Sequence, residues 1–164
     1  MSKKSLRIMV DANAWIDSYC SWHASCDSAR AFFNAVGECD LLLYPVHVAK
    51  DVLFVIGQEF KRATVQETGT PLTESQVQAA NAAALACMRN MCERATAVGA
   101  DSSDIWLADK YLATHLDFED NLVLAACRRA KADYLVTADK VLIEHADVCA
   151  KTPRQMTEIL QNRA

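Results

Sequence analysis

The chain lacks several features that would assign it to a common protein class. No apolar run approaches the ~18 residues that a membrane-spanning helix requires. The apolar stretch behind the basic first residues ends at Asp11, which is too early for a secretory signal peptide. No C-x-x-C pair occurs among the seven cysteines, so zinc-binding and dithiol redox motifs are disfavoured. These absences predict a cytoplasmic protein with free thiols and no membrane segment.

The sequence also lacks an excess of positive charge and is poor in aromatic residues. It has 17 Lys and Arg against 21 Asp and Glu, a net charge of −4. Simple nucleic-acid binders are usually basic, yet a bound cation with a local basic rim would still attract phosphates. Aromatics make up 7% of the 164 residues and apolar residues 52%, which predicts one aliphatic core and a single domain spanning 1–164.

Short apolar runs alternate with segments of helical periodicity along the whole chain. The runs that predict strands are 6–10, 41–44 and 134–137, with weaker candidates at 96–100 and 148–150. The segments that predict helices are 27–36, 46–64, 73–95, 103–114, 117–131 and a last one beginning at Pro153. Thr73 and Gln76 approximate a capping box. Strands that alternate with helices indicate an α/β fold with a central, mainly parallel sheet.

Four aspartates are placed where such a sheet would gather them. Asp11 ends the first apolar run and Asp139 follows the run 134–137, while Asp51 and Asp120 lie near helix starts. Ligands of open α/β sheets bind outside the carboxyl ends of the strands. Carboxylates held together there repel one another unless a cation neutralises them. A hard divalent cation, Mg²⁺ or Mn²⁺, is the expected occupant of this four-carboxylate site.

Each aspartate also has a structural interpretation. Asp11 is a suitable helix cap and Asp139 a suitable turn residue. Asp117 is favoured as the N-cap of the helix that carries Asp120, with a second, supporting contribution to the metal site. Convergence of four carboxylates at one edge favours the metal interpretation over four independent caps.

Two neutral side chains are candidate supports for these carboxylates. Asn13 follows Asp11, and Thr137 ends the fourth strand. A hydroxyl or amide at a strand end can hydrogen-bond a carboxylate, although it can equally satisfy local backbone groups. His47 is the histidine of interest because it is near Asp51.

Three segments together resemble PIN-domain ribonucleases. The stretches 8–17, 117–126 and 134–139 are similar to the first, third and fourth motifs of that family. The resemblance implies an α/β/α sandwich and an endoribonuclease that uses Mg²⁺ or Mn²⁺ at Asp11, Asp51, Asp120 and Asp139. Glu59 competes with Asp51 for the second motif. Many family members are toxins of type II toxin–antitoxin pairs, so the resemblance also implies an RNA substrate and an antitoxin partner.

Two other functions remain open. One is a non-catalytic PIN-like module that binds RNA or protein. The other is a phosphotransferase with Asp11 as an aspartyl-phosphate nucleophile, against which Asn13 counts because a dehalogenase-like enzyme expects a second aspartate there. A metal titration would distinguish the metal-dependent ribonuclease from the non-catalytic module.

The remaining expectations concern packing and partners. The helices of 46–95 carry apolar and small residues on more than one face, which predicts a homodimer interface or an antitoxin-binding surface. Those residues are Phe54, Ile56, Val65, Val77, Ala80, Ala83, Leu85 and Met91. Trp15, Trp22 and Trp106 are expected mainly in the core, and Asp17 and Glu119 on the solvated surface.

Overall fold

A five-stranded parallel sheet forms the centre of the protein, as seen in a computed structural model that describes residues 5–115 and 117–163. Its strand order is β3-β2-β1-β4-β5, and every neighbouring pair is parallel. The strands are β1 (Arg7–Val10), β2 (Leu41–Pro45), β3 (Thr96–Val98), β4 (Tyr134–Val136) and β5 (Ala150–Lys151). The predicted parallel α/β sheet is therefore confirmed.

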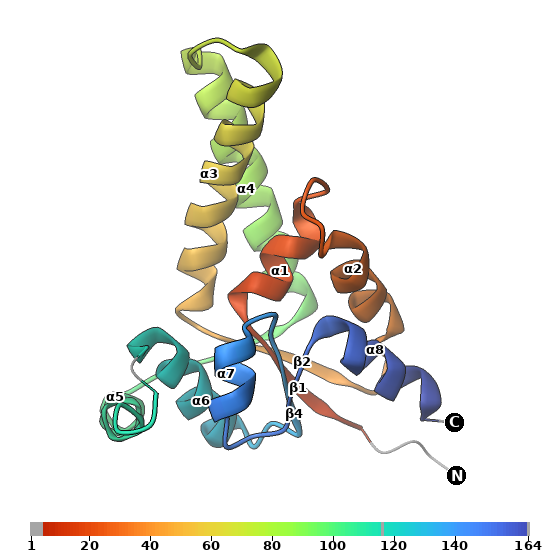
Figure 1. Ribbon diagram of the computed structural model, residues 1–164, viewed down its shortest axis with the longest axis vertical. Coiled ribbons are helices and arrows are strands. Elements are labelled where there is room, and N and C mark those ends of the chain that lie inside the picture. The colour runs from red at the N-terminus through yellow and green to blue at the C-terminus, as the bar shows by residue number, and fades with distance from the viewer. Residues whose placement is uncertain (1–4, 116, 164) are drawn as a thin grey trace.

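Helices cover both faces of this sheet (Figure 1). Those described are α1 (Ala12–Tyr19), α2 (Cys26–Ala35), α3 (Val48–Thr68), α4 (Glu74–Arg94), α5 (Ser102–Tyr111), α6 (Phe118–Ala130), α7 (Lys140–His145) and α8 (Pro153–Asn162). Side chains alternate along β1, so Ile8 and Val10 join the core under α1, α2, α3 and α8. Met9 points the other way, into the core shared with α6 and α7. The predicted α/β/α sandwich is confirmed.

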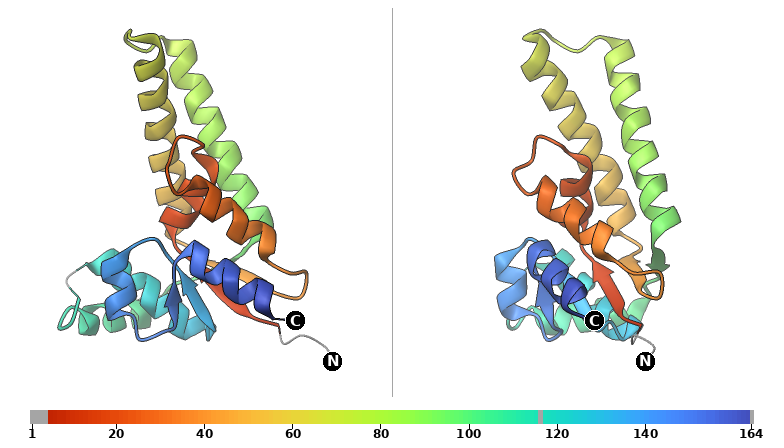
Figure 2. Two further views of the ribbon diagram at one scale, coloured as in Figure 1. Left: turned by 45° about the vertical axis from the view of Figure 1, so that its right-hand side comes forward. Right: turned by 90° about the vertical axis from the view of Figure 1, so that its right-hand side faces the viewer.

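Helices α3 and α4 form a long hairpin that stands out from the rest of the molecule (Figures 1 and 2). The capping box of Thr73 and Gln76 starts α4 as predicted. Gly69 ends α3 with a left-handed φ of 65° and donates its N–H to the carbonyl of Val65, so α3 extends beyond the predicted end at residue 64. On this hairpin Ile56 is buried, whereas Phe54 is 65% exposed.

Several structural expectations are wrong. Trp22 and Trp106 are 45% and 62% exposed, and only Trp15 of the three tryptophans lies in the core. Asp17 is buried, and hydrogen bonds with Ser25 and His23 offset the cost of burying its carboxylate. Helix α7 was not among the predicted helices, and Asp139, for which a turn was one interpretation, is its N-cap.

All seven cysteines are free, in agreement with the absence of paired motifs. Within residues 5–115 and 117–163, no helix has both the length and the apolar character that crossing a membrane would demand.

Candidate metal-binding active site

Asp11 lies at the carboxyl end of the central strand β1, in the middle of the sheet. It is the N-cap of α1 and is only 7% exposed. The backbone N–H of Ala12 donates to Oδ1 at 2.7 Å. Thr137 Oγ1 and Asn13 Nδ2 both donate to Oδ2, each at 2.8 Å. The carboxylate is thus oriented by three donors, with one lone pair of Oδ1 left for a further partner.

Asn13 and Thr137 join the ends of β1 and β4. Asn13 donates to Thr137 Oγ1 at 2.9 Å through its amide nitrogen, and its amide oxygen accepts the N–H of Ala138. Thr137 is fully buried and also accepts the N–H of Asp139 at 3.1 Å. Both neutral side chains therefore contact the acidic cluster, as the sequence suggested.

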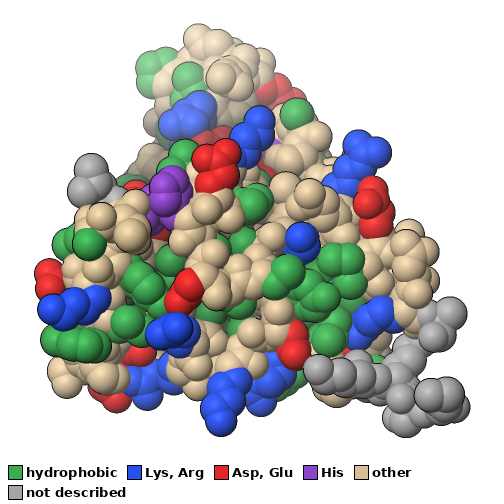
Figure 3. Space-filling model, turned by 60° about the horizontal axis from the view of Figure 1, so that its bottom comes forward, with side chains coloured by type: hydrophobic (Ala, Val, Ile, Leu, Met, Phe, Trp, Pro, Cys, Tyr) green, Lys and Arg blue, Asp and Glu red, His purple; other side chains and the backbone are tan. Residues whose placement is uncertain are grey.

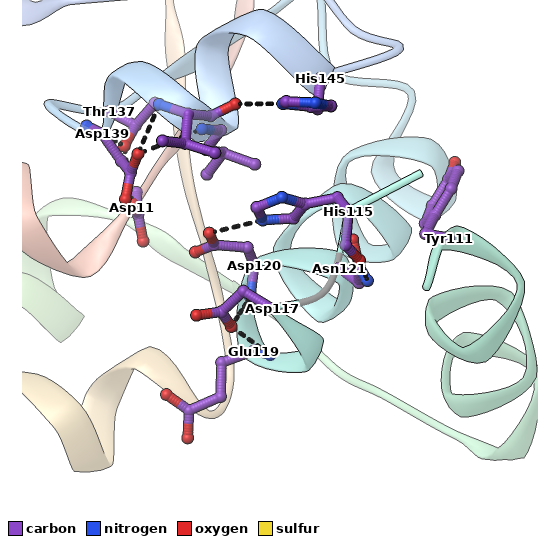
Figure 4. A network of polar contacts seen from close by, with 12 residues as sticks. Asp11, Tyr111, His115, Asp117, Glu119, Asp120, Asn121, Thr137, Asp139 and His145 are labelled. Atoms are coloured by element: carbon purple, nitrogen blue, oxygen red, sulfur yellow. Dashed lines mark hydrogen bonds and ion pairs between the residues drawn. The ribbon is translucent and has the colours of Figure 1, made fainter. Parts of the chain in front are cut away.

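Asp139 is the N-cap of α7, the short helix that was not predicted. Its Oδ1 accepts the N–H groups of Val141 and Leu142 at 2.7 and 3.1 Å. Its Oδ2 accepts no hydrogen bond from the described residues. Figure 4 shows this carboxylate beside Thr137 and Asp11. Asp139 is therefore a cap that keeps one oxygen available.

Asp117 and Asp120 have different roles at the start of α6. Asp117 is the N-cap, and its Oδ1 accepts the N–H groups of Glu119 and Asp120. Asp120 instead receives a hydrogen bond at Oδ2 from His115 Nε2 at 2.9 Å. His115 was not singled out from the sequence, because nothing in its local spacing links it to a carboxylate five residues later.

A cavity of about 230 Å³ opens beside these groups. Asp11, Asp51 and Asp120 line it together with His47 and Glu119. Glu119 is exposed, as expected, and it also lines this cavity. Lys50 forms an ion pair with Asp51 at 3.2 Å, and the buried Nε2 of His47 has no hydrogen-bond partner among the described residues.

Glu59 belongs to a different cluster. Its carboxylate lies 3.4 Å from His23 Nε2 and 2.5 Å from Arg62 Nη1, and it does not line the acidic cavity. His23 Nδ1 is 2.8 Å from Asp17. The hydrogen bonds to Asp17 and Glu59 outweigh burial and raise the pKa of His23. Of the two candidates for the second motif, the cavity contains Asp51.

Asp11, Asp120 and Asp139 form an acidic cluster, and hydrogen bonds from the protein only partly offset the cost of ionising it. Burial raises the pKa of Asp11 to about 6; the hydrogen bonds from Thr137 and Ala12 oppose this, and the charges of Asp120 and Asp139 add to it. Burial raises the pKa of Asp120 as well, against the hydrogen bond from His115. A nearby cation would stabilise the ionised forms of these carboxylates, which burial and neighbouring negative charges destabilise.

The donor set fits a hard divalent cation, since it consists of carboxylate oxygens at a sheet edge with free lone pairs. These carboxylates are near one another but are not yet arranged around a single metal position. Among residues 5–115 and 117–163, no three His, Cys, Asp or Glu side chains are already close enough to form a metal site. Bringing Asp51 or Asp120 closer would require side-chain movement within the cavity.

The sheet order and the layers of helices define a PIN-domain fold. Mycobacterium tuberculosis VapC20, described as a Sarcin-Ricin loop cleaving toxin, has a structure similar to this chain. The TM-score is 0.65, and the match covers 87% of this chain and 97% of VapC20, at 13% sequence identity. No family model matches the sequence, and no curated protein matches it. The likeness therefore establishes the fold.

Proposed function

We propose that this protein is a Mg²⁺- or Mn²⁺-dependent endoribonuclease whose metal ligands are Asp11, Asp51, Asp120 and Asp139. The observation that carries the proposal is the buried carboxylate of Asp11. It lies at the carboxyl edge of the sheet and next to two further aspartates, and its pKa is about 6. A buried carboxylate whose ionisation is made unfavourable by its surroundings, and which lines a cavity, is a candidate functional residue.

The chain's own residues would hold the cation and attract the phosphate backbone of the substrate. Asp11 keeps one lone pair of Oδ1 after its three hydrogen bonds. Asp139 accepts its two capping bonds at Oδ1 alone, and Asp120 accepts its bond from His115 at Oδ2. A divalent cation held by these carboxylates would lower the pKa of a bound water and offset charge developing on a phosphodiester. Lys50, which forms an ion pair with Asp51, would attract the phosphate backbone electrostatically.

RNA as the substrate is supported by the fold. VapC20 is described as cleaving the Sarcin-Ricin loop, and a toxin of that type would also have an antitoxin partner. The face shown in Figure 3 carries acidic and basic side chains side by side without one continuous basic surface. The chain has a net charge of −4, so attraction of phosphates would depend mainly on the cation and on nearby basic residues.

Cleavage of labelled oligonucleotides tests the proposal. The wild-type protein should cleave single-stranded or stem–loop RNA in the presence of Mn²⁺ and should be inactive with excess chelator. Asp11→Asn should be inactive under the same conditions. A DNA oligonucleotide of the same sequence serves as the substrate control. Absence of RNA cleavage with either Mg²⁺ or Mn²⁺ would argue against the proposal.

One observation favours a second candidate, a non-catalytic binding module. The described carboxylates are not already converged on a metal position. Calorimetric titration of the protein with Mn²⁺ separates the candidates, because the module has no need of the cation. RNA binding without any Mn²⁺ binding would favour the module.

A further inference from the structure

His115 hydrogen-bonds Asp120, which lines the cavity, but His115 is not itself one of the lining residues. Its Nε2 lies 2.9 Å from Asp120 Oδ2, and the side chain is 8% exposed. The backbone around it is fixed as well, since its N–H donates to the carbonyl of Tyr111 and its carbonyl accepts the side-chain amide of Asn121 at 2.8 Å. The imidazole thus has little freedom to leave the carboxylate.

Helix α7 supports His115 through a ring contact. The ring of His145 stacks on that of His115 with centroids 5.4 Å apart and planes 25° apart. His145 also bonds the carbonyl of Val141 through Nδ1 at 2.8 Å. The same six-residue helix begins at its N-cap Asp139. One short element therefore fixes Asp139 at one end and braces the partner of Asp120 at the other (Figure 4).

The two oxygens of Asp120 are consequently unequal. Oδ2 accepts from His115, whereas Oδ1 accepts no hydrogen bond from the described residues. In Figure 4 the carboxylate points toward Asp11 while His115 approaches it from the other side. Partners of this kind fix the orientation of metal-binding side chains, and their loss typically weakens metal affinity about 10- to 100-fold.

We propose that His115 is a positioning residue, which occupies Oδ2 of Asp120 and leaves Oδ1 as the oxygen that binds the cation. This inference rests on the proposed metal-dependent function. His115 contacts neither cation nor RNA and acts through Asp120 alone. A purely structural role, in which His115 only anchors the segment between α5 and α6, predicts a loss of stability with unchanged metal affinity.

Calorimetric Mn²⁺ titration of substituted proteins distinguishes these roles. His115→Phe keeps a ring against His145 but has no donor, so its Mn²⁺ affinity should fall at least about 10-fold. His115→Gln places an amide N–H near the position of Nε2 and should stay within about threefold of wild type. Tyr111→Phe is the matched control. It loses a 2.6 Å hydrogen bond to the carboxylate of Asp147 in the same region and should bind Mn²⁺ as wild type does.

If His115→Phe does not fold, the comparison of His115→Gln with His115→Asn tests the same role. His115→Asn also carries an amide but is one methylene shorter than His115→Gln, so it should bind Mn²⁺ more weakly. Equal affinities of wild type and His115→Phe, or of the Gln and Asn variants, would overturn the positioning role alone. Failure of the wild type to bind Mn²⁺ would overturn the proposed function, and the positioning role with it.

Discussion

Thr137 donates its hydroxyl proton to Asp11 Oδ2 across 2.8 Å, although the two residues are 126 positions apart in the chain. The same hydroxyl oxygen accepts the N–H of Asp139 at 3.1 Å. One buried side chain therefore ties the first aspartate to the last. The acidic cluster is organised by hydrogen bonds of the protein itself, before any ligand is present.

Thr137→Val should destabilise the protein and weaken Mn²⁺ binding. Valine has nearly the shape of threonine but cannot donate to Asp11, so a buried carboxylate loses a partner at a cost of about 1–3 kcal/mol. Urea denaturation measures the loss, and Thr137→Ser is the control that keeps the hydroxyl. Wild-type stability of the valine variant would show that the hydroxyl contributes nothing to holding Asp11.

Without a divalent cation, the protein should become less stable as the pH rises from about 4 to about 6. Asp11 has a pKa of about 6 in the folded state against an ordinary 3.8. Between these values the folded state binds a proton that the unfolded chain has released, so protonation stabilises the fold and that gain is lost by about pH 6. The contribution is about 3 kcal/mol, and Asp120 acts in the same direction.

The melting temperature measured from pH 4 to 7 in chelator tests this expectation. Asp11→Asn cannot titrate at this position, so its melting temperature should change less steeply with pH. Saturating Mn²⁺ should raise the wild-type melting temperature most above pH 6, where the carboxylate is ionised. Identical pH profiles for wild type and Asp11→Asn would contradict the assigned pKa.

The sheet and most helices could be predicted because they depend on local patterns. Apolar runs specify β1 and β4, and the capping box of Thr73 and Gln76 specifies the start of α4. Strand ends in a parallel sheet share one edge, so the proximity of Asp11 and Asp139 also follows from sequence position. The electrostatic influence of Asp139 on Asp11 agrees with this.

The residues that were missed depend on contacts between distant or irregular segments. His115 precedes α6, and only the path of the chain brings its ring to Asp120 and His145. Asp17 has the spacing of a surface residue but is enclosed by the segment between α1 and α2. Helix α7 is six residues long, too short for a hydrophobic period to reveal, and the capping preference of Asp139 was its one local signal.

Asp117→Ala and Asp120→Asn should have opposite effects. Asp117 caps α6 through two backbone N–H groups, so its loss should cost about 1 kcal/mol of stability and leave most of the cleavage activity. Asp120→Asn should abolish cleavage without loss of stability, because it removes a charge from a crowded acidic cluster. Chemical denaturation and an RNA cleavage assay measure the two effects. Loss of cleavage in Asp117→Ala at wild-type stability would reverse this division of roles.

The hairpin of α3 and α4 carries a groove of about 530 Å³ whose lining is mainly apolar. Its lining includes Leu53, Phe54 and Leu85, together with the basic residues Lys50 and Lys61. Because Phe54 is 65% exposed on a segment that projects from the sheet, we expect this surface to be covered by a second copy of the chain.

Size-exclusion chromatography with light scattering should then give twice the monomer mass of 18.1 kDa at micromolar concentration. Phe54→Asp should shift the protein to monomer, because a charge in an apolar interface remains unpaired. Ile105→Asp, at an exposed position on α5, is the matched control and should leave the mass unchanged. A wild-type monomer across this concentration range would exclude the dimer, and capture of an antitoxin by wild type but not by Phe54→Asp would assign the groove to that partner.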